Sequence, residues 1–172
     1  MGMGNQEEEE EMMATPKYEY LSHADMDGYY AEVCRAMAGA QYKPDVIIAL
    51  SRGGLDFGVK LSNWFDDVPM IPISWQTRSG DDQQGNLLRD VLKQHSDKTS
   101  VLIVDDINDS GKTLLGIEGV VREATDPFSV DYAVAIENTE SEFETTWHGR
   151  EIHRSEDTQW FVFPWENWWK SQ

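Results

Sequence analysis

Val101-Leu102-Ile103-Val104-Asp105-Asp106-Ile107-Asn108-Asp109-Ser110-Gly111-Lys112-Thr113-Leu114 is the stretch that decides the fold. Its apolar start predicts a buried strand that runs into two adjacent carboxylates, and its second half predicts a tight turn and a helix. Open α/β sheets bind ligands at the carboxyl ends of parallel strands. The backbone amides from Ser110 to Thr113 suit a phosphate, and Asp105 and Asp106 suit ribose hydroxyls, directly or through a divalent cation. The stretch therefore predicts a sugar-phosphate site.

Gly111-Lys112-Thr113 also matches the last three residues of a Walker A loop. That loop requires a glycine five residues before Gly111, where this chain has Asp106, so a kinase or ATPase is disfavoured. The simpler alternative is an ordinary strand-turn-helix in which Asp and Ser only form the turn and cap the helix. The order of all fourteen residues is more specific than that alternative requires.

Strands alternate with helices along the rest of the chain. Continuous apolar runs predict strands at 45–50, 69–74, 101–105 and 130–136. Helical spacing predicts helices near 30–37, 57–65, 87–92 and 114–121, the second with Phe57, Leu61, Trp64 and Phe65 facing inward. This alternation is typical of an α/β protein with a doubly wound, mostly parallel sheet. Because the rhythm breaks at Asn138, we expect 138–172 to form most of a small C-terminal hood within one domain, 16–172.

The chain is strongly acidic, with 14 Lys and Arg against 32 Asp and Glu and a net charge of −18. This charge disfavours nucleic acid and anionic membranes as partners, and no apolar run is long enough to span a bilayer. Residues 1–15, with the acidic block 7–11, predict a disordered leader rather than a signal peptide, so we expect a cytoplasmic protein. The single cysteine, Cys34, is expected to be buried and inert in a helix.

The opening stretch resembles the phosphoribosyl pyrophosphate (PRPP) motif of type I phosphoribosyltransferases, in which two acids end a strand and Asp-Ser/Thr-Gly-x-Thr follows. The resemblance implies that Asp105 and Asp106 hold the ribose and Mg²⁺, possibly through water, with Mg²⁺ as the cofactor. It implies that Asp109, Ser110, Gly111, Lys112 and Thr113 bind PRPP and that Asp109 is also the general base. It also implies a homo-oligomer, a dimer or a tetramer.

Ser51-Arg52-Gly53-Gly54 follows the first predicted strand of the sheet. Two glycines allow backbone amides to approach a ligand, and Arg52 can bind phosphate oxygens with its planar fork. The tetrapeptide resembles the pyrophosphate loop of the 6-oxopurine phosphoribosyltransferases, which implies that Ser51, Arg52 and Gly53 bind PRPP. Taken alone, it is equally consistent with a plain turn.

Trp160-Phe161-Val162-Phe163-Pro164-Trp165-Glu166 resembles the purine-recognition segment of the same enzymes. The resemblance implies that Trp160 stacks on the base, Phe161 offers main-chain contacts, and Glu166 lies near the exocyclic group at C2. A hydrophobic clamp that closes the core is the alternative. The family's lysine after the fourth strand is missing, and Asn138 would offer the purine O6 only a neutral hydrogen bond.

The loop 76–85 is expected to close as a lid over the reacting centre, or else to be a simple solvated loop. Together the resemblances cover nearly all of the chain after residue 20 and imply transfer of a phosphoribosyl group from PRPP to a purine. Two alternatives stay open: a non-catalytic PRPP or nucleotide sensor, and a transferase for another base.

Overall fold

The computed structural model describes residues 17–75, 82–95, 97, 100–124, 129–166 and 169. Their elements follow in the order β1 (Tyr18–Tyr20), α2 (His23–Gly39), β2 (Val46–Ser51), α3 (Gly54–Trp64), β3 (Met70–Ser74), α4 (Asp82–Gln94), β4 (Ser100–Asn108), α5 (Lys112–Glu123), β5 (Ser129–Asn138), β6 (Trp147–Ile152) and β7 (Trp160–Val162). The expected leader and most of the expected lid, 76–81, lie outside the described residues.

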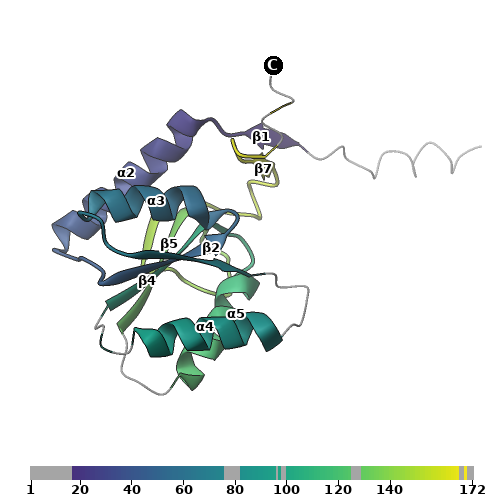
Figure 1. Ribbon diagram of the computed structural model, residues 1–172. Coiled ribbons are helices and arrows are strands. Elements are labelled where there is room, and N and C mark those ends of the chain that lie inside the picture. The colour runs from purple at the N-terminus through teal and green to yellow at the C-terminus, as the bar shows by residue number, and fades with distance from the viewer. Residues whose placement is uncertain are drawn as a thin grey trace, which may run out of the picture.

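Five parallel strands form the main sheet, in the order β3-β2-β4-β5-β6. Helices α2 and α3 cover one face and α4 and α5 the other (Figure 1), which confirms the doubly wound α/β fold. Strand β3, the next strand in the chain after β2, pairs with one edge of β2, and β4 pairs with the opposite edge. The strand order therefore reverses between β2 and β4, and ligands bind at such a reversal in open α/β sheets.

Alternating side chains of the central strands fill two apolar cores. Val46, Ile48 and Leu50 of β2 pack on the α4–α5 side, while Ile47 and Ala49 pack on the α2–α3 side. Strand β4 alternates in the same way, as expected when both faces of a parallel sheet are covered. The sheet is thus a rigid base whose strand ends hold the polar residues.

One local expectation is confirmed and two are corrected. Cys34 is a buried, free cysteine in α2. Trp64 is 54% exposed, so it does not belong to the inner face of α3. Residues 82–85, which we placed in the loop, form the first turn of α4, because that helix begins at Asp82.

The C-terminal part divides between two sheets, which corrects in part the expected hood over 138–172. Strand β6 extends the main sheet beside β5, and only β7 leaves it, pairing with β1 in a separate two-stranded sheet. The hood is therefore β1 with β7 and the residues around them, at the upper right of Figure 1. Gly149 allows β6 to lie close to α2, because a Cβ there would come within 2.5 Å of the Tyr29 carbonyl oxygen.

A buried polar cluster lies where β4 and β5 end. Glu137 is 3% exposed, and its carboxylate accepts hydrogen bonds from the Asn108 amide (3.0 Å) and the Thr145 hydroxyl (2.8 Å). Asn108 also donates to the Phe143 carbonyl oxygen at 2.6 Å. Burial raises the pKa of Glu137. The cluster fixes the connection between β5 and β6 to the end of β4.

Replacing Thr145 with Val should destabilise the protein. The substitution preserves shape but leaves Glu137 Oε2 without its 2.8 Å donor, and a buried group left unsatisfied costs about 1–3 kcal/mol. Urea unfolding of Thr145→Val should show a loss of this size. Thr158→Val, at an exposed threonine, is the control, and an equal loss in both variants would contradict the role of the cluster.

Candidate active site

The two acids that end the apolar part of β4 lie beside the turn after β2. Asp105 Oδ1 accepts from the Asp106 amide at 3.0 Å, and Asp106 Oδ1 accepts from the Ile107 amide at 2.7 Å. A Cβ at Gly53 would lie 2.1 Å from Asp106 Oδ2, and one at Gly54 would lie 2.3 Å from the Val104 carbonyl oxygen. Gly54 is thus required by the close approach of the turn to the β4 backbone, whereas a larger residue at 53 would force the Asp106 carboxylate to move. The turn also contains a cis peptide bond between Ser51 and Arg52.

Both acids hold their protons more tightly than ordinary carboxyl groups. Burial raises the pKa of Asp106 to about 7, and the nearby Glu166 charge also raises it. Burial, and then the charge of Asp106, raises the pKa of Asp105 well above its usual range. A bound cation would favour the charged forms of both groups.

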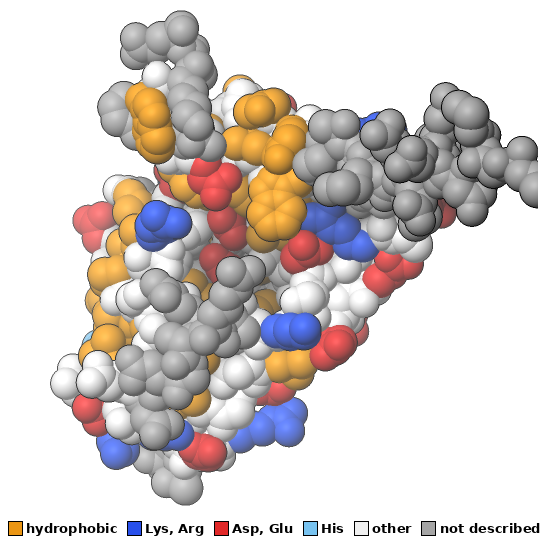
Figure 2. All heavy atoms as spheres, turned by 90° about the vertical axis from the view of Figure 1, so that its right-hand side faces the viewer, with side chains coloured by type: hydrophobic (Ala, Val, Ile, Leu, Met, Phe, Trp, Pro, Cys, Tyr) orange, Lys and Arg blue, Asp and Glu red, His pale blue; other side chains and the backbone are white. Residues whose placement is uncertain are grey.

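A cavity of about 1410 Å³ opens at this end of the sheet, on the face shown in Figure 2. Its polar wall combines the strand ends, α3 and the hood: Ser51, Arg52, Asp56, Asp106, Glu166 and His23. Its aromatic wall consists of Tyr18, Trp75, Trp160, Trp165 and Trp169. Hydrophobic side chains gather above acidic ones on this face (Figure 2). The cavity can therefore hold a ligand with one flat apolar part and one polar part.

The turn that begins α5 starts after Ile107 and Asn108, the last two residues of β4, which separate it from the two acids. Gly111 has a positive φ of 84°, and a Cβ there would lie 2.7 Å from both the Phe143 backbone nitrogen and the Ser141 hydroxyl. The Ser110 carbonyl oxygen accepts from the Glu142 amide at 3.3 Å. The β5–β6 connection therefore packs against the backbone of this turn at Ser110 and Gly111. The side chain of Lys112 is exposed.

Among the residues expected at the site, Ser51, Arg52, Gly53, Asp106, Trp160 and Glu166 line the cavity. Trp160 is 62% exposed, so its ring is accessible to a ligand. Glu166 Oε2 accepts from the Phe163 amide at 3.2 Å, which fixes the turn at Pro164. Phe161 differs from the other aromatic residues of this segment, because its side chain is buried and its main chain is in register with Glu19 of β1.

Asn138 has contacts other than the one expected. The residue is 4% exposed, and its side-chain amide nitrogen donates to the Asp109 carbonyl oxygen at 2.7 Å. Its side-chain oxygen accepts from the amides of Glu140 (3.1 Å) and Arg154 (3.3 Å). Asn138 therefore braces the Asp109 turn, and it is not among the residues that line the cavity.

Arg154, which no sequence pattern predicted, forms an ion pair with Asp109. The Arg154 Nε lies 2.7 Å from Asp109 Oδ1, and Nη2 lies 3.2 Å from Oδ2. The two residues are 45 positions apart, and no local pattern distinguishes Arg154 from a surface arginine. The sequence also did not predict three residues of the cavity wall, Asp56, Trp75 and Trp169, because no local pattern relates them to the site.

The donor set around Asp106 suits Mg²⁺ completed by a ligand and water. Mg²⁺ is often held by one or two carboxylates plus substrate phosphates rather than by a protein cage, and two adjacent carboxylates with raised pKa values fit that pattern. Over the described part of the chain, no group of three or more His, Cys, Asp or Glu side chains could hold a metal. In the same residues, no helix is long and apolar enough to cross a membrane.

The phosphoribosyl transferase domain family matches residues 21–171, so the chain belongs to this family. The fold is similar to a purine phosphoribosyltransferase from Pyrococcus horikoshii, with 26% identity, a TM-score of 0.63, and coverage of 87% of this chain and 95% of that one. Comparison with curated protein sequences gave no match.

Two further solved structures share the fold at lower identity. The Helicobacter pylori xanthine-guanine-hypoxanthine phosphoribosyltransferase has 17% identity and a TM-score of 0.65, covering 89% of this chain and 96% of that one. A hypothetical protein from Neisseria gonorrhoeae with bound ppGpp has 19% identity and a TM-score of 0.61, covering 88% and 90%.

The pH dependence of stability tests the electrostatics of the acid pair. A carboxyl group with a higher pKa in the folded than in the unfolded chain binds more protons when folded, so stability falls as pH rises from about 4 to about 7. We expect Asp106→Asn to flatten this dependence and to stabilise the ligand-free protein at pH 8, by on the order of 2 kcal/mol.

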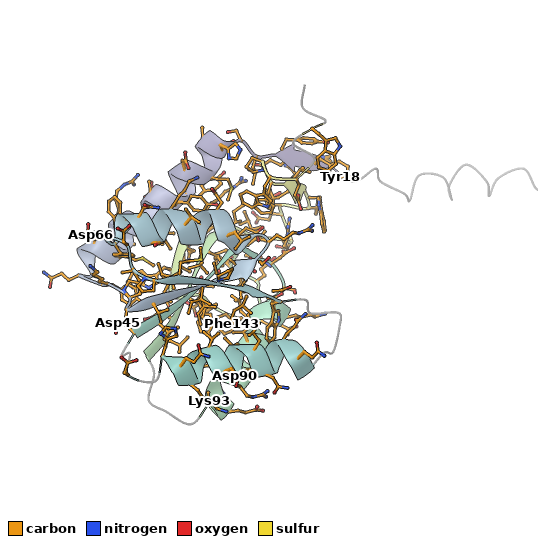
Figure 3. All side chains as sticks on the ribbon, in the orientation of Figure 1. Tyr18, Asp45, Asp66, Asp90, Lys93 and Phe143 are labelled. Carbon is orange, nitrogen blue, oxygen red and sulfur yellow. The ribbon has the colours of Figure 1, made fainter. Side chains whose placement is uncertain are left out.

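Urea unfolding at pH 5, 6, 7 and 8 measures this effect. Asp90→Asn is the matched control, because Asp90 is exposed on α4 (Figure 3). Parallel pH curves for wild type and Asp106→Asn would contradict the raised pKa.

Proposed function

We propose that this protein transfers the 5-phosphoribosyl group of PRPP to a 6-oxopurine base, guanine, xanthine or hypoxanthine, giving the nucleoside 5′-monophosphate and pyrophosphate. The observation that carries the proposal is the shared cavity of Asp106, the Ser51–Gly53 turn and Trp160 in a chain of the phosphoribosyltransferase family. The similarity to a purine phosphoribosyltransferase at 26% identity supports a purine as the acceptor.

The PRPP half of the substrate would lie along the strand ends. The backbone amides from Ser110 to Thr113, at the start of α5, would bind the 5′-phosphate. Ser51, Arg52 and Gly53 would bind the pyrophosphate, with the guanidinium of Arg52 on its oxygens. Asp105 and Asp106 would accept hydrogen bonds from the ribose hydroxyls. Lys112 would add positive charge near the phosphate.

The charge of the cavity wall supports Mg²⁺ as a cofactor. Asp56, Asp106 and Glu166 are acidic, whereas the lining residues that can carry positive charge are Arg52 and His23. A polyanion such as PRPP would be repelled from this wall unless a cation offsets the charge. Mg²⁺ held by Asp105 and Asp106, directly or through water, would stabilise the charge that develops on the departing pyrophosphate.

The base would lie against the aromatic wall, with Trp160 stacked on the purine ring, Phe161 offering its main chain, and Glu166 near the exocyclic group at C2. The purine N9 forms a bond to C1′ while the bond from C1′ to pyrophosphate breaks. Asp109 would accept the proton that purine N7 loses, as a general base. The residues that line the cavity would exclude water from the oxocarbenium-like transition state.

A nucleotide-binding regulator of the same fold is the second candidate. The similar fold of the Neisseria gonorrhoeae protein with bound ppGpp favours this alternative. A transferase for another base is the third. A panel of bases distinguishes the three candidate functions. Guanine, hypoxanthine, xanthine, adenine, uracil and orotate are each tested with PRPP and Mg²⁺, and pyrophosphate release is measured. Transfer to a 6-oxopurine supports the proposal, and preference for adenine or a pyrimidine, or no transfer at all, contradicts it.

Asp109→Asn should lower kcat and leave the affinity for PRPP largely unchanged. The amide cannot accept the purine proton, and loss of a general base typically costs about a hundredfold or more. Steady-state kinetics give kcat, and calorimetry gives the Kd of PRPP. Asp66→Asn, at an exposed acid at the opposite end of the sheet (Figure 3), controls for the change in charge. Wild-type turnover in Asp109→Asn would refute the assignment of the base.

Trp160→Ala should weaken binding of the base more than binding of PRPP. Loss of an aromatic stacking partner costs about 0.5–1.5 kcal/mol beyond the lost contact area, so the KM for the base should rise at least several-fold. Trp64→Ala is the matched control, because Trp64 and Trp160 are 54% and 62% exposed but only Trp160 lines the cavity. Equal effects of the two substitutions on KM would exclude stacking on Trp160.

A further inference from the structure

Arg154 joins the Asp109 turn to the hood through four hydrogen bonds. Two of them reach the Asp109 carboxylate oxygens, at 2.7 and 3.2 Å. Nη1 donates to the carbonyl oxygens of Asp157 (3.2 Å) and Gln159 (2.5 Å). Gln159 directly precedes Trp160 at the start of β7. A single side chain, only 23% exposed, thus connects Asp109 to the base of the aromatic wall.

The backbone of Asp109 is held by the same group of residues. The Asn138 amide donates to the Asp109 carbonyl oxygen at 2.7 Å, and the Asn138 side-chain oxygen accepts from the Arg154 amide at 3.3 Å. Asp109 is therefore fixed at its backbone by Asn138 and at its carboxylate by Arg154. The orientation of the carboxylate depends on Arg154, because its χ angles would otherwise be free to rotate.

Arg150 provides an internal comparison. The Phe161 ring has the guanidinium groups of Arg154 and Arg150 at 5.0 and 5.2 Å from its centroid. Arg150 pairs with Glu19 of β1 at 2.5 Å and with Asp157 at 3.6 Å, and its contacts do not include Asp109. Both arginines therefore stabilise the hood, but only Arg154 also reaches the Asp109 carboxylate.

We infer that Arg154 is a positioning residue of the transfer reaction, which holds the Asp109 carboxylate at a fixed distance from a base stacked on Trp160. The inference rests on the proposed function. The planar fork of an arginine can bind both carboxylate oxygens and two carbonyl groups at once, whereas a lysine cannot. A displacement of a reacting group by about 1 Å can cost a hundredfold in rate, so this fixed geometry matters for kcat.

A double-mutant cycle on kcat tests this role. Arg154→Ala should lower kcat by about a hundredfold with little change in the KM for PRPP. In the Asp109→Asn background the same substitution should have little further effect, because Arg154 acts through Asp109. Arg154→Lys should restore only part of kcat, and added methylguanidine should rescue Arg154→Ala but not Arg154→Lys.

Arg150→Ala is the control for a purely structural role. Its effect on kcat should be the same in the wild-type and Asp109→Asn backgrounds, because Arg150 pairs with Glu19 and Asp157. If Arg154→Ala lowers kcat equally in both backgrounds, Arg154 only stabilises the hood and the inference is overturned.

Melting temperatures give a second readout that does not depend on turnover. The losses in Tm caused by Arg154→Ala and Asp109→Asn should be smaller in the double variant than their sum, whereas Arg150→Ala and Asp109→Asn should add. Additive losses for Arg154 and Asp109 would overturn the inference. Absence of transfer to any base by the wild-type protein would instead overturn the proposed function, and the Tm cycle would still test the ion pair.

Discussion

The close approach of the Asp106 carboxylate to the Gly53 backbone is the contact on which the candidate site depends. A Cβ at residue 53 would overlap the carboxylate, so a larger residue there would force Asp106 to move. The contact requires β2 and β4 to be neighbours, which they are at the reversal of the strand order. The Ser51–Gly53 turn and the Asp106 carboxylate are thereby brought to one cavity.

This arrangement concentrates negative charge in the ligand-free protein. Asp105 and Asp106 are adjacent acids with raised pKa values, and the Glu166 charge acts on Asp106, in a chain of net charge −18. Binding sites often retain such unfavourable interactions, since function and stability select for different residues. Repulsion among these acids lowers the stability of the folded protein. A bound cation would relieve that repulsion, so the same acids would strengthen its binding.

The hood and the main sheet meet through a few specific side chains. Arg150 ties β6 to β1 through Glu19, and Arg154 ties the segment before β7 to Asp109. Phe161 lies beside both guanidinium groups. The aromatic wall is consequently not an independent lobe, because its position relative to the strand ends is set by ion pairs and ring contacts.

The sequence by itself determined the alternation of strands and helices, the acids that follow the apolar run of β4, and the glycine turn after β2, because these follow from local periodicity and turn chemistry. It did not determine that β6 joins the sheet. The connection 139–146 contains no helix, and Trp147–Ile152 is too polar to read as a buried strand. Only the tertiary structure decided that Asn138 contacts the Asp109 backbone and that Arg154 pairs with the Asp109 carboxylate, because both contacts join residues far apart in the chain that no local pattern relates.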